Sequence, residues 1–364
     1  MIFVFILLAI LILMLMVTIH EFGHYLAGKI LGFKINEFSV GFGPKILGRK
    51  SKKTGEEFSV RAVPLGGYCA FYGEEGDESV KNEQFDNVAG EKSLSFNEQK
   101  PWKRIIVLLS GALFNLFSAF IFSFIYILAV GYSLPVIDEI YNNPFSGDSY
   151  ASELRVGDKI VAVEDVELGV MNSFAELTSS LKVNESITIT VIRDGKKKDL
   201  IISKQKVMLI ADENNYESRE LFGFKLTYEK TKVSPLYAIG NSFPFTFKMA
   251  GLILSSFGQL FTGQVPISEL SGPIGTVATI ATYAEANLEY LLLFLPLIAS
   301  NLAIFNILPI PSLDGSKIVF TIIEWVRGKP INRKVEGYLH GVGLILLLIF
   351  VVVIDLIGII LRFI

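Results

Sequence analysis

Four long stretches of the chain carry almost no charged residue. They cover residues 2–19, 105–131, 290–312 and 341–361. Each is close to the roughly 20 residues that a helix needs to cross the hydrocarbon core of a bilayer. The pattern therefore predicts four transmembrane helices, which we assign to residues 1–31, 104–132, 288–314 and 340–364.

The first stretch could also be a removable signal peptide. No basic segment precedes it, however, and no small-x-small cleavage site follows it. We therefore expect it to remain in the mature protein as the first transmembrane helix.

The charges between the apolar stretches predict the orientation of the chain. Residues 132–154 contain acidic residues but neither Lys nor Arg, whereas residues 32–103 include Lys45, Arg49, Lys50, Lys52 and Lys53. Because loops rich in Lys and Arg stay on the cytoplasmic side, residues 32–103 and the basic loop 315–339 are predicted to be cytoplasmic. The segment that follows the second helix is then outside.

Residues 208–287 are predicted to form a linker and amphipathic helices on the outer membrane surface. Within them, residues 236–261 are apolar enough to suggest a fifth span, but Asn241, Pro244, Lys248 and Gln259 interrupt the pattern. A fifth crossing would also place the basic loop 315–339 outside, against the positive-inside rule.

Residues 133–207 are predicted to fold as an α+β domain outside the membrane. The sequence has β-type runs at residues 159–163, 186–193 and 199–203, and a polar helix around residues 173–181. The stretch Leu154-Arg155-Val156-Gly157-Asp158-Lys159-Ile160 resembles the Leu-x-x-Gly-Asp-x-Ile signature of PDZ domains. This resemblance implies a domain that binds an extended peptide as an added strand. An unrelated small α+β domain is the alternative.

The composition agrees with a membrane protein and excludes other classes. Hydrophobic residues make up 51% of the chain, and the mean hydropathy is +0.50, which is too apolar for an ordinary soluble protein. A net charge of −3, with no basic stripe, argues against nucleic acid as a partner. The single cysteine, Cys69, excludes an internal disulfide, and we interpret it as a packing residue.

The last third of the first predicted helix contains His20-Glu21-Phe22-Gly23-His24, an HExxH motif. On a helix this spacing places two imidazoles on one face, where both can bind one Zn²⁺, and the glutamate beside them can take a proton from the attacking water. A histidine pair in a helical core is the alternative. Ionisable groups inside a spanning helix are expensive, however, and only three histidines occur in the chain.

A catalytic zinc keeps three protein ligands and one open position, so a third ligand is required. His340, at the start of the last apolar stretch, is one candidate. Asp314 is the better one, because Pro309 and Pro311 break the third helix just before it and free the chain to direct a carboxylate inward. The four-span topology places Asp314 near the same membrane face as His24.

These motifs resemble those of the site-2 proteases, peptidase family M50, and in particular the bacterial RseP-type zinc metalloproteases that regulate sigma factors. The resemblance rests on HEFGH at 20–24, NILPIPSLDG at 306–315 and the PDZ-like segment between them, with further matches at Gly111-x-x-x-Asn115 and at residues 271–275. It implies that His20, His24 and Asp314 bind zinc and that Glu21 is the general base.

The resemblance also implies substrate-binding residues. Asn301 and Asn306 in the third helix are associated with substrate handling in the family, although hydrogen bonding between helices is an equal alternative. Residues 57–68 resemble the family's cytoplasmic β-hairpin, in which Gly66, Gly67 and Tyr68 would hold a substrate extended by strand pairing. A plain cytoplasmic turn is the alternative.

The expected fold class is a polytopic α-helical membrane protein with four transmembrane helices, an inserted α+β PDZ-like domain and a cytoplasmic, membrane-dipping β-hairpin. The resemblance implies a Zn²⁺ endopeptidase of the bacterial inner membrane. Its substrates would be signal-peptide remnants and single-span proteins, such as anti-sigma factors already cut by a site-1-type protease. A zinc transporter that uses the same ligands and an inactive PDZ scaffold are the alternatives, although a transporter would not need Glu21 and a scaffold would be expected to lose a ligand.

Overall fold

The computed structural model describes residues 2–74, 94–212, 215–264, 266 and 270–363. The chain forms two compact units. The first contains Met1–Ser123 and Thr246–Ile364, and the second contains Phe124–Phe245. Of the predicted cytoplasmic segment 32–103, residues 75–93 lie outside the described part.

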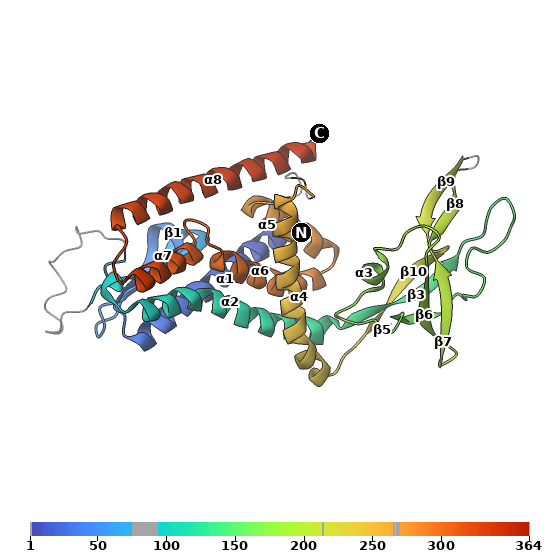
Figure 1. Ribbon diagram of the computed structural model, residues 1–364, viewed down its shortest axis with the longest axis horizontal. Coiled ribbons are helices and arrows are strands. Elements are labelled where there is room, and N and C mark those ends of the chain that lie inside the picture. Colours follow the sequence, from blue (N-terminus) through green and yellow to red (C-terminus); the bar gives the residue numbers. More distant parts are fainter. Residues whose placement is uncertain (1, 75–93, 213–214, 265, 267–269, 364) are drawn as a thin grey trace. The chain divides into compact units, whose positions relative to one another are not determined.

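Four helices of the described part are long and apolar enough to cross a membrane. They are α1 (Ile2–Leu31), α2 (Pro101–Val130), α6 (Glu289–Ile307) and α8 (Arg333–Phe363). Each contains most of one apolar stretch of the sequence. The start of α1 and the end of α8 lie at the same end of the first unit (Figure 1), as an even number of crossings requires. The chain thus has the helices of a multi-pass membrane protein and, in its second unit, a β-sheet domain.

The helices of the first unit approach one another closely where their side chains are small. A Cβ added to Gly23 of α1 would lie 2.5 Å from the carbonyl oxygen of Ser110 in α2. Helices in a bilayer associate largely through such close packing, because lipid provides no hydrophobic drive between them. The backbones of α1 and α2 are therefore in direct contact next to His24.

The segment predicted to lie on the outer surface contains two helices that differ in character. α4 (Pro235–Phe261) is not among the four candidate spans, and its residues 246–261 run crosswise to α8 in Figure 1. α5 (Pro273–Ala286) contacts α1, α6 and α8 and buries Ile280, Ala281 and Ala284. α5 therefore packs against the longer helices through small apolar residues, and its position on the outer membrane surface stays a prediction.

Asp355, a buried residue of α8, holds the beginning of α5. Its carboxylate accepts hydrogen bonds from the backbone N–H groups of Ile274, at 3.1 Å, and Gly275, at 2.9 Å. A carboxylate is stabilised at a helix N-terminus because the first N–H groups have no partner within the helix. The family-like segment 271–275 thus has a structural role in this chain.

β1 (Ile35–Lys50) and β2 (Glu57–Phe71) form an antiparallel pair that folds back on itself. Residues 35–40 pair with residues 67–71 on one side and with residues 57–60 on the other, and residues 57–60 pair in turn with residues 47–50. Residues 57–68, predicted to form a membrane-dipping hairpin, instead belong to the single strand β2 of a small sheet whose edges in space are the segments 45–50 and 67–71. Both strands contact α1.

The predicted loop 315–339 begins with a helix. α7 (Asp314–Arg327) starts at Asp314, which therefore belongs to α7 and not to the end of the third span. A buried ion network anchors this helix: Glu324 accepts hydrogen bonds from Arg104 at 2.6 Å and lies 2.8 Å from Arg333. The network joins α7 to the starts of α2 and α8, and only the tertiary structure brings these charges together.

The second unit contains a six-stranded antiparallel sheet with the strand order β10-β3-β4-β6-β7 and the short β5 paired to β4. A separate two-stranded hairpin, β8 and β9, and the short helix α3 complete it. The elements are β3 (Tyr132–Ile140), β4 (Lys159–Val163), β5 (Val166–Glu167), α3 (Phe174–Thr178), β6 (Ser186–Arg193), β7 (Lys196–Ser203), β8 (Gln205–Asp212), β9 (Asn215–Leu221) and β10 (Phe224–Thr231).

The predicted strands 159–163 and 186–193 are confirmed, but the predicted domain boundary at residue 207 is wrong. β10 pairs with β3 from Phe224 opposite Ile140 to Thr231 opposite Tyr132. The sheet therefore includes β10, which lies within residues 208–287, predicted as a linker with surface helices. The exposed polar residues of β10 resemble those of a surface segment. The place of β10 in the sheet depends on β3, which lies far away in the chain.

The Leu-x-x-Gly-Asp-x-Ile stretch forms the turn into β4. Leu154 and Ile160 are buried in the core of the sheet domain, and Gly157 has a φ of 91°, which favours glycine. Asp158 accepts a hydrogen bond from the Arg155 backbone N–H at 2.8 Å and two from the guanidinium of Arg193, at 2.8 and 2.6 Å. The motif therefore stabilises a tight turn against β6.

Candidate metal centre

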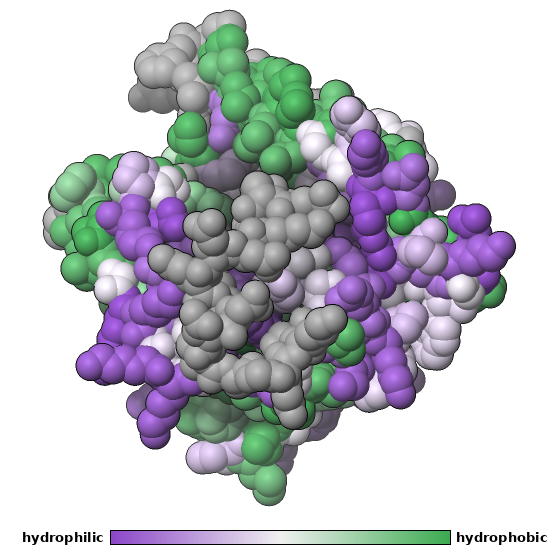
Figure 2. All heavy atoms as spheres, turned by 90° about the vertical axis from the view of Figure 1, so that its left-hand side faces the viewer, coloured by the Kyte–Doolittle hydropathy of each residue, from purple (hydrophilic) through white to green (hydrophobic). Residues whose placement is uncertain are grey.

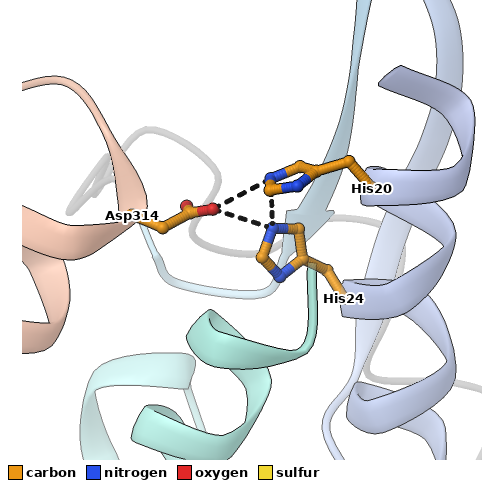
Figure 3. Close-up of side chains that lie close together, drawn as sticks. All are labelled: His20, His24 and Asp314. Atoms are coloured by element: carbon orange, nitrogen blue, oxygen red, sulfur yellow. Dashed lines mark hydrogen bonds and ion pairs between the residues drawn. The ribbon is translucent and has the colours of Figure 1, made fainter. Parts of the chain in front are cut away.

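Three predicted ligands converge in the first unit, two from α1 and one from α7 (Figure 3). Nε2 of His20 lies 2.9 Å from Oδ2 of Asp314, Nε2 of His24 lies 3.1 Å from the same oxygen, and the two Nε2 atoms are 3.1 Å apart. Both histidines are buried, with 7% of each residue exposed. The α-helical spacing brings the imidazoles together, while Asp314 reaches them from a residue 290 positions further along the chain.

Outer contacts orient the two rings. Nδ1 of His24 is 2.8 Å from the carbonyl oxygen of Val107 in α2. Because a carbonyl can only accept, Nδ1 carries the hydrogen, and in the neutral ring Nε2 presents a lone pair to the other two ligands. Such a hydrogen bond to the second ring nitrogen is typical of histidines that bind metal ions.

Asn115 of α2 supports His20 in a similar way. Its Nδ2 lies 3.3 Å from Nδ1 of His20, and its Oδ1 is buried without a hydrogen-bond partner. A half-turn of the amide exchanges these two atoms, so that Oδ1 can accept the Nδ1–H of a His20 that binds metal through Nε2. The side chain of Asn115, which is fully buried, can thus accept the hydrogen bond that the Nδ1–H of a metal-bound His20 would donate.

The three ligand atoms fit a tetrahedral zinc ion. Ligands about 2.0–2.1 Å from such an ion lie roughly 3.3 Å from one another, close to the separations of 2.9–3.1 Å found here. Two neutral imidazoles and one carboxylate are also the nitrogen and oxygen ligands that Zn²⁺ prefers, and the carboxylate offsets part of the ion's charge in an apolar region. Three converging acceptors would repel one another unless a cation lay between them.

Glu21 lies beside this cluster and against the edge of the β-sheet. A Cβ added to Gly67 would be 3.4 Å from Cγ of Glu21, and the Glu21 carboxylate is within hydrogen-bonding reach of the Cys69 backbone. The segment 67–71 therefore passes directly over the carboxylate that follows His20 in the motif. Cys69 itself is buried, as expected of a packing residue.

The other predicted site residues have more varied environments. The ring of Phe42 covers Gly66, whose φ is 125°, and the hydroxyl of Tyr68 donates to Glu37 at 2.8 Å within the sheet.

Asn301 and Asn306 both lie on α6. Because they are five residues apart on a regular helix, their side chains point about 140° away from each other. A shared contact with one substrate group is therefore not supported by α6 alone.

His340 is not part of the cluster. Its Nδ1 accepts a hydrogen bond from the Ser312 backbone N–H at 3.2 Å, and its backbone oxygen accepts one from the Ser312 hydroxyl at 3.1 Å. Ser312 has a φ of 79° in the turn that leads to Asp314. The alternative third ligand thus contacts the turn before Asp314 and not the imidazoles. Neither this contact nor the Val107 contact had a signal in the sequence.

Two histidines of a candidate membrane span and a carboxylate of α7 thus form a group that could hold a metal ion, as a membrane metalloprotease requires. The family model described as peptidase family M50 matches residues 8–350, so the chain belongs to this family, the site-2 proteases. Membership decides between the classes left open by the sequence: the chain is a zinc metalloprotease, and neither a transporter nor an inactive scaffold is supported.

Relatives along the whole length agree. A Fusobacterium nucleatum protein named "putative zinc metalloprotease" is 30% identical, with 96% of each chain covered. Zinc metalloprotease RasP of Geobacillus kaustophilus is 26% identical, with 93% of this chain and 94% of the relative covered. A Helicobacter pylori protein with the same name as the first is 28% identical over 94% of this chain and 96% of its own.

Proposed function

We propose that His20, His24 and Asp314 hold the catalytic zinc and that Glu21 is the general base of peptide-bond hydrolysis within the membrane. The observation that carries this proposal is the convergence of the three ligand atoms within 2.9–3.1 Å, with Glu21 adjacent in α1. The cluster lies in the last third of a helix long enough to span a bilayer, so the reaction takes place away from bulk water.

The chemistry follows from these positions. Bound zinc supplies a Lewis acid that polarises the scissile carbonyl and makes water easier to deprotonate. Glu21 accepts the proton of the attacking water and later delivers it to the leaving amine. The Val107 carbonyl and Asn115 hold the imidazoles in one orientation, and the apolar surroundings of α1 and α2 exclude additional water.

The sheet edge 67–71 supports the handling of a helical substrate. A helix hides its carbonyl groups in internal hydrogen bonds and must be unwound before water can attack them. Among the described residues, the only strand partner of the segment 67–71 is 35–40, which would leave its other side, next to Glu21, to pair with a substrate strand. In this role Gly66, Gly67 and Tyr68 act through their backbone, since the Tyr68 hydroxyl already binds Glu37.

The natural substrates in this proposal are transmembrane segments of single-span proteins in a bacterial inner membrane. Anti-sigma factors shortened by a site-1-type protease and remnant signal peptides have this form. The sheet domain, whose Leu154–Ile160 turn resembles that of PDZ domains, acts as a filter against proteins with an intact outer domain. Asn301 and Asn306 keep their proposed roles in substrate handling, one face of α6 each.

Replacement of Glu21 by Gln tests the mechanism. The amide cannot act as a base, whereas all three zinc ligands remain, so purified Glu21→Gln protein should keep stoichiometric zinc and lose cleavage of a transmembrane peptide. Zinc content and cleavage are measured on the same sample reconstituted in lipid. Turnover like that of the wild type in this variant contradicts the assignment of the general base.

A further inference from the structure

The turn between β1 and β2 carries a cluster of basic side chains, which we call the basic tip: residues 49–53, Arg49-Lys50-Ser51-Lys52-Lys53. These residues, together with Phe58, line a hollow on the protein surface. Arg49, Lys52 and Lys53 are exposed, and within the described residues no acidic group pairs with these three. Figure 2 views the end of the first unit that holds α7 and the start of α8, where hydrophilic residues gather around the rim.

The contacts of Glu56 place the basic tip beside the last turn of α1, the end at which this candidate span would leave the membrane. Glu56 follows the tip by three residues, is buried, and forms an ion pair with Lys29 in the last turn of α1. Lys29 is eight residues beyond Glu21, about 12 Å further along the helix axis. The tip therefore lies near the polar boundary of the bilayer, whereas Gly67 of the same sheet lies at the depth of Glu21.

The strand that leads into the tip exposes two consecutive apolar side chains. Ile46 is 63% exposed and Leu47 is 67% exposed, at the point where the register of β1 against β2 shifts between Lys45 and Leu47. Exposed aliphatic side chains beside a basic cluster are favourable where the surroundings are acyl chains, so these two residues would adjoin lipid next to the tip.

We propose that the basic tip is a binding site for the phosphate of anionic phospholipid headgroups, with Ile46 and Leu47 inserted among the acyl chains beneath. Arg49, Lys52 and Lys53 supply the positive charge, and the hollow they line accepts the headgroup. Basic clusters beside an apolar surface are attracted to anionic lipids in this way. The bound lipid holds the sheet edge at a constant depth relative to Glu21.

The test uses the full chain in lipid nanodiscs and does not depend on catalysis, so it can be run in the Glu21→Gln background. An environment-sensitive fluorophore is attached to Ser51→Cys; the wild type, whose one cysteine is buried, controls for labelling elsewhere. Nanodiscs contain phosphatidylcholine with increasing fractions of phosphatidylglycerol. The emission should shift with the anionic fraction and saturate.

The variant Arg49→Gln/Lys52→Gln/Lys53→Gln should raise the half-saturating anionic fraction about tenfold or more. A matched control, Lys196→Gln/Lys197→Gln/Lys198→Gln in β7, removes the same charge from exposed residues of the other unit and should respond as the parent does. Equal responses of the two triple variants overturn the proposal. Inorganic phosphate added to pure phosphatidylcholine nanodiscs should have no effect, and a shift with free phosphate would also overturn it.

Discussion

Gly111 of α2 lies directly against the imidazole of His24. A Cβ added to Gly111 would be 2.5 Å from Nε2 of His24 and 2.7 Å from Cε1 of His20, closer than real Cβ atoms approach other atoms. Any side chain at this position must displace the two rings or the backbone of α2, and so disturb the convergence of the rings with Asp314.

Gly111→Ala should therefore lower zinc affinity at least about tenfold, and cleavage with it, since misplaced ligands cost metal affinity on this scale. Zinc content after dialysis against a graded series of chelator concentrations measures the change. Gly258→Ala is the matched control: its added Cβ has no neighbour within 4 Å, and alanine is the better helix former by about 1 kcal/mol. Equal zinc affinity in both variants would contradict the close approach at Gly111.

Asp314→Ala should lose stoichiometric zinc, whereas His340→Ala should retain it. The Asp314→Ala substitution removes a ligand atom and the negative charge that offsets the ion, whereas His340 contacts only the turn at Ser312. Metal analysis of the purified variants distinguishes them. Retained zinc in the aspartate variant together with loss in the histidine variant would transfer the third ligand position to His340.

The Asp158–Arg193 pair should make the stability of the sheet domain depend on pH. Burial raises the pKa of Asp158, but hydrogen bonds from the Arg193 guanidinium and the Arg155 backbone outweigh it and hold the pKa below its ordinary value. With a lowered pKa in the folded state, the stabilisation is present above the unfolded value of about 3.9. It is lost as the pH falls through the folded value.

Arg193→Gln should therefore weaken the domain at neutral pH by about 3 kcal/mol, because it leaves a buried carboxylate without its charged partner. The deficit should shrink as the pH falls below 4, where Asp158 is protonated in the unfolded chain. The exchange rates of the β4 and β6 amide hydrogens in the full-length protein measure this loss of stability. The control is Arg219→Gln, which breaks an exposed pair with Glu217 and should change the exchange rates little. A stability deficit of Arg193→Gln that has the same size at all pH values would contradict the link to protonation of Asp158.

Deletion of the sheet domain should broaden the range of substrates without abolishing cleavage. Because β10 pairs with β3, a deletion of residues 135–206 would leave β10 without its partner strand. Removal of residues 132–231 avoids this, and its ends are adjacent, since Thr231 pairs with Tyr132. Cleavage of membrane proteins with and without an intact outer domain measures selectivity. Loss of all cleavage in a stably folded deletion would indicate an essential docking role instead.

Local patterns in the sequence were sufficient for several features. The spacing of His20 and His24 determines that both rings share one helix face, whatever else the chain does. The apolar stretches are long enough to predict α1, α2, α6 and α8, and the runs that became β4 and β6 were recognisable from residue type alone. These features depend on neighbours within a few residues, so the sequence records them directly.

Features that join distant segments were predicted poorly. The sequence predicts that the sheet domain ends at residue 207, yet β10 belongs to it, because strand pairing depends on a partner about ninety residues away, at the register given by Thr231 and Tyr132. The prolines before Asp314 predict only a broken helix end and give no sign that α7 starts at Asp314. The contact of Asp355 in α8 with the first N–H groups of α5 likewise has no signal in the sequence.

By itself, the sequence determined the membrane class and the helix face shared by His20 and His24, the two proposed ligands beside Glu21, since these follow from hydrophobic length and helical periodicity. The sequence also favoured Asp314 over His340 as the third ligand, but only the tertiary structure shows how Asp314 reaches the imidazoles, because its position depends on how α7 meets α1. The tertiary structure also decided that Gly111 leaves room for the rings and that Val107 and Asn115 orient them. Helical periodicity specifies one face of one element, whereas a metal site requires several elements to meet within a few tenths of an ångström.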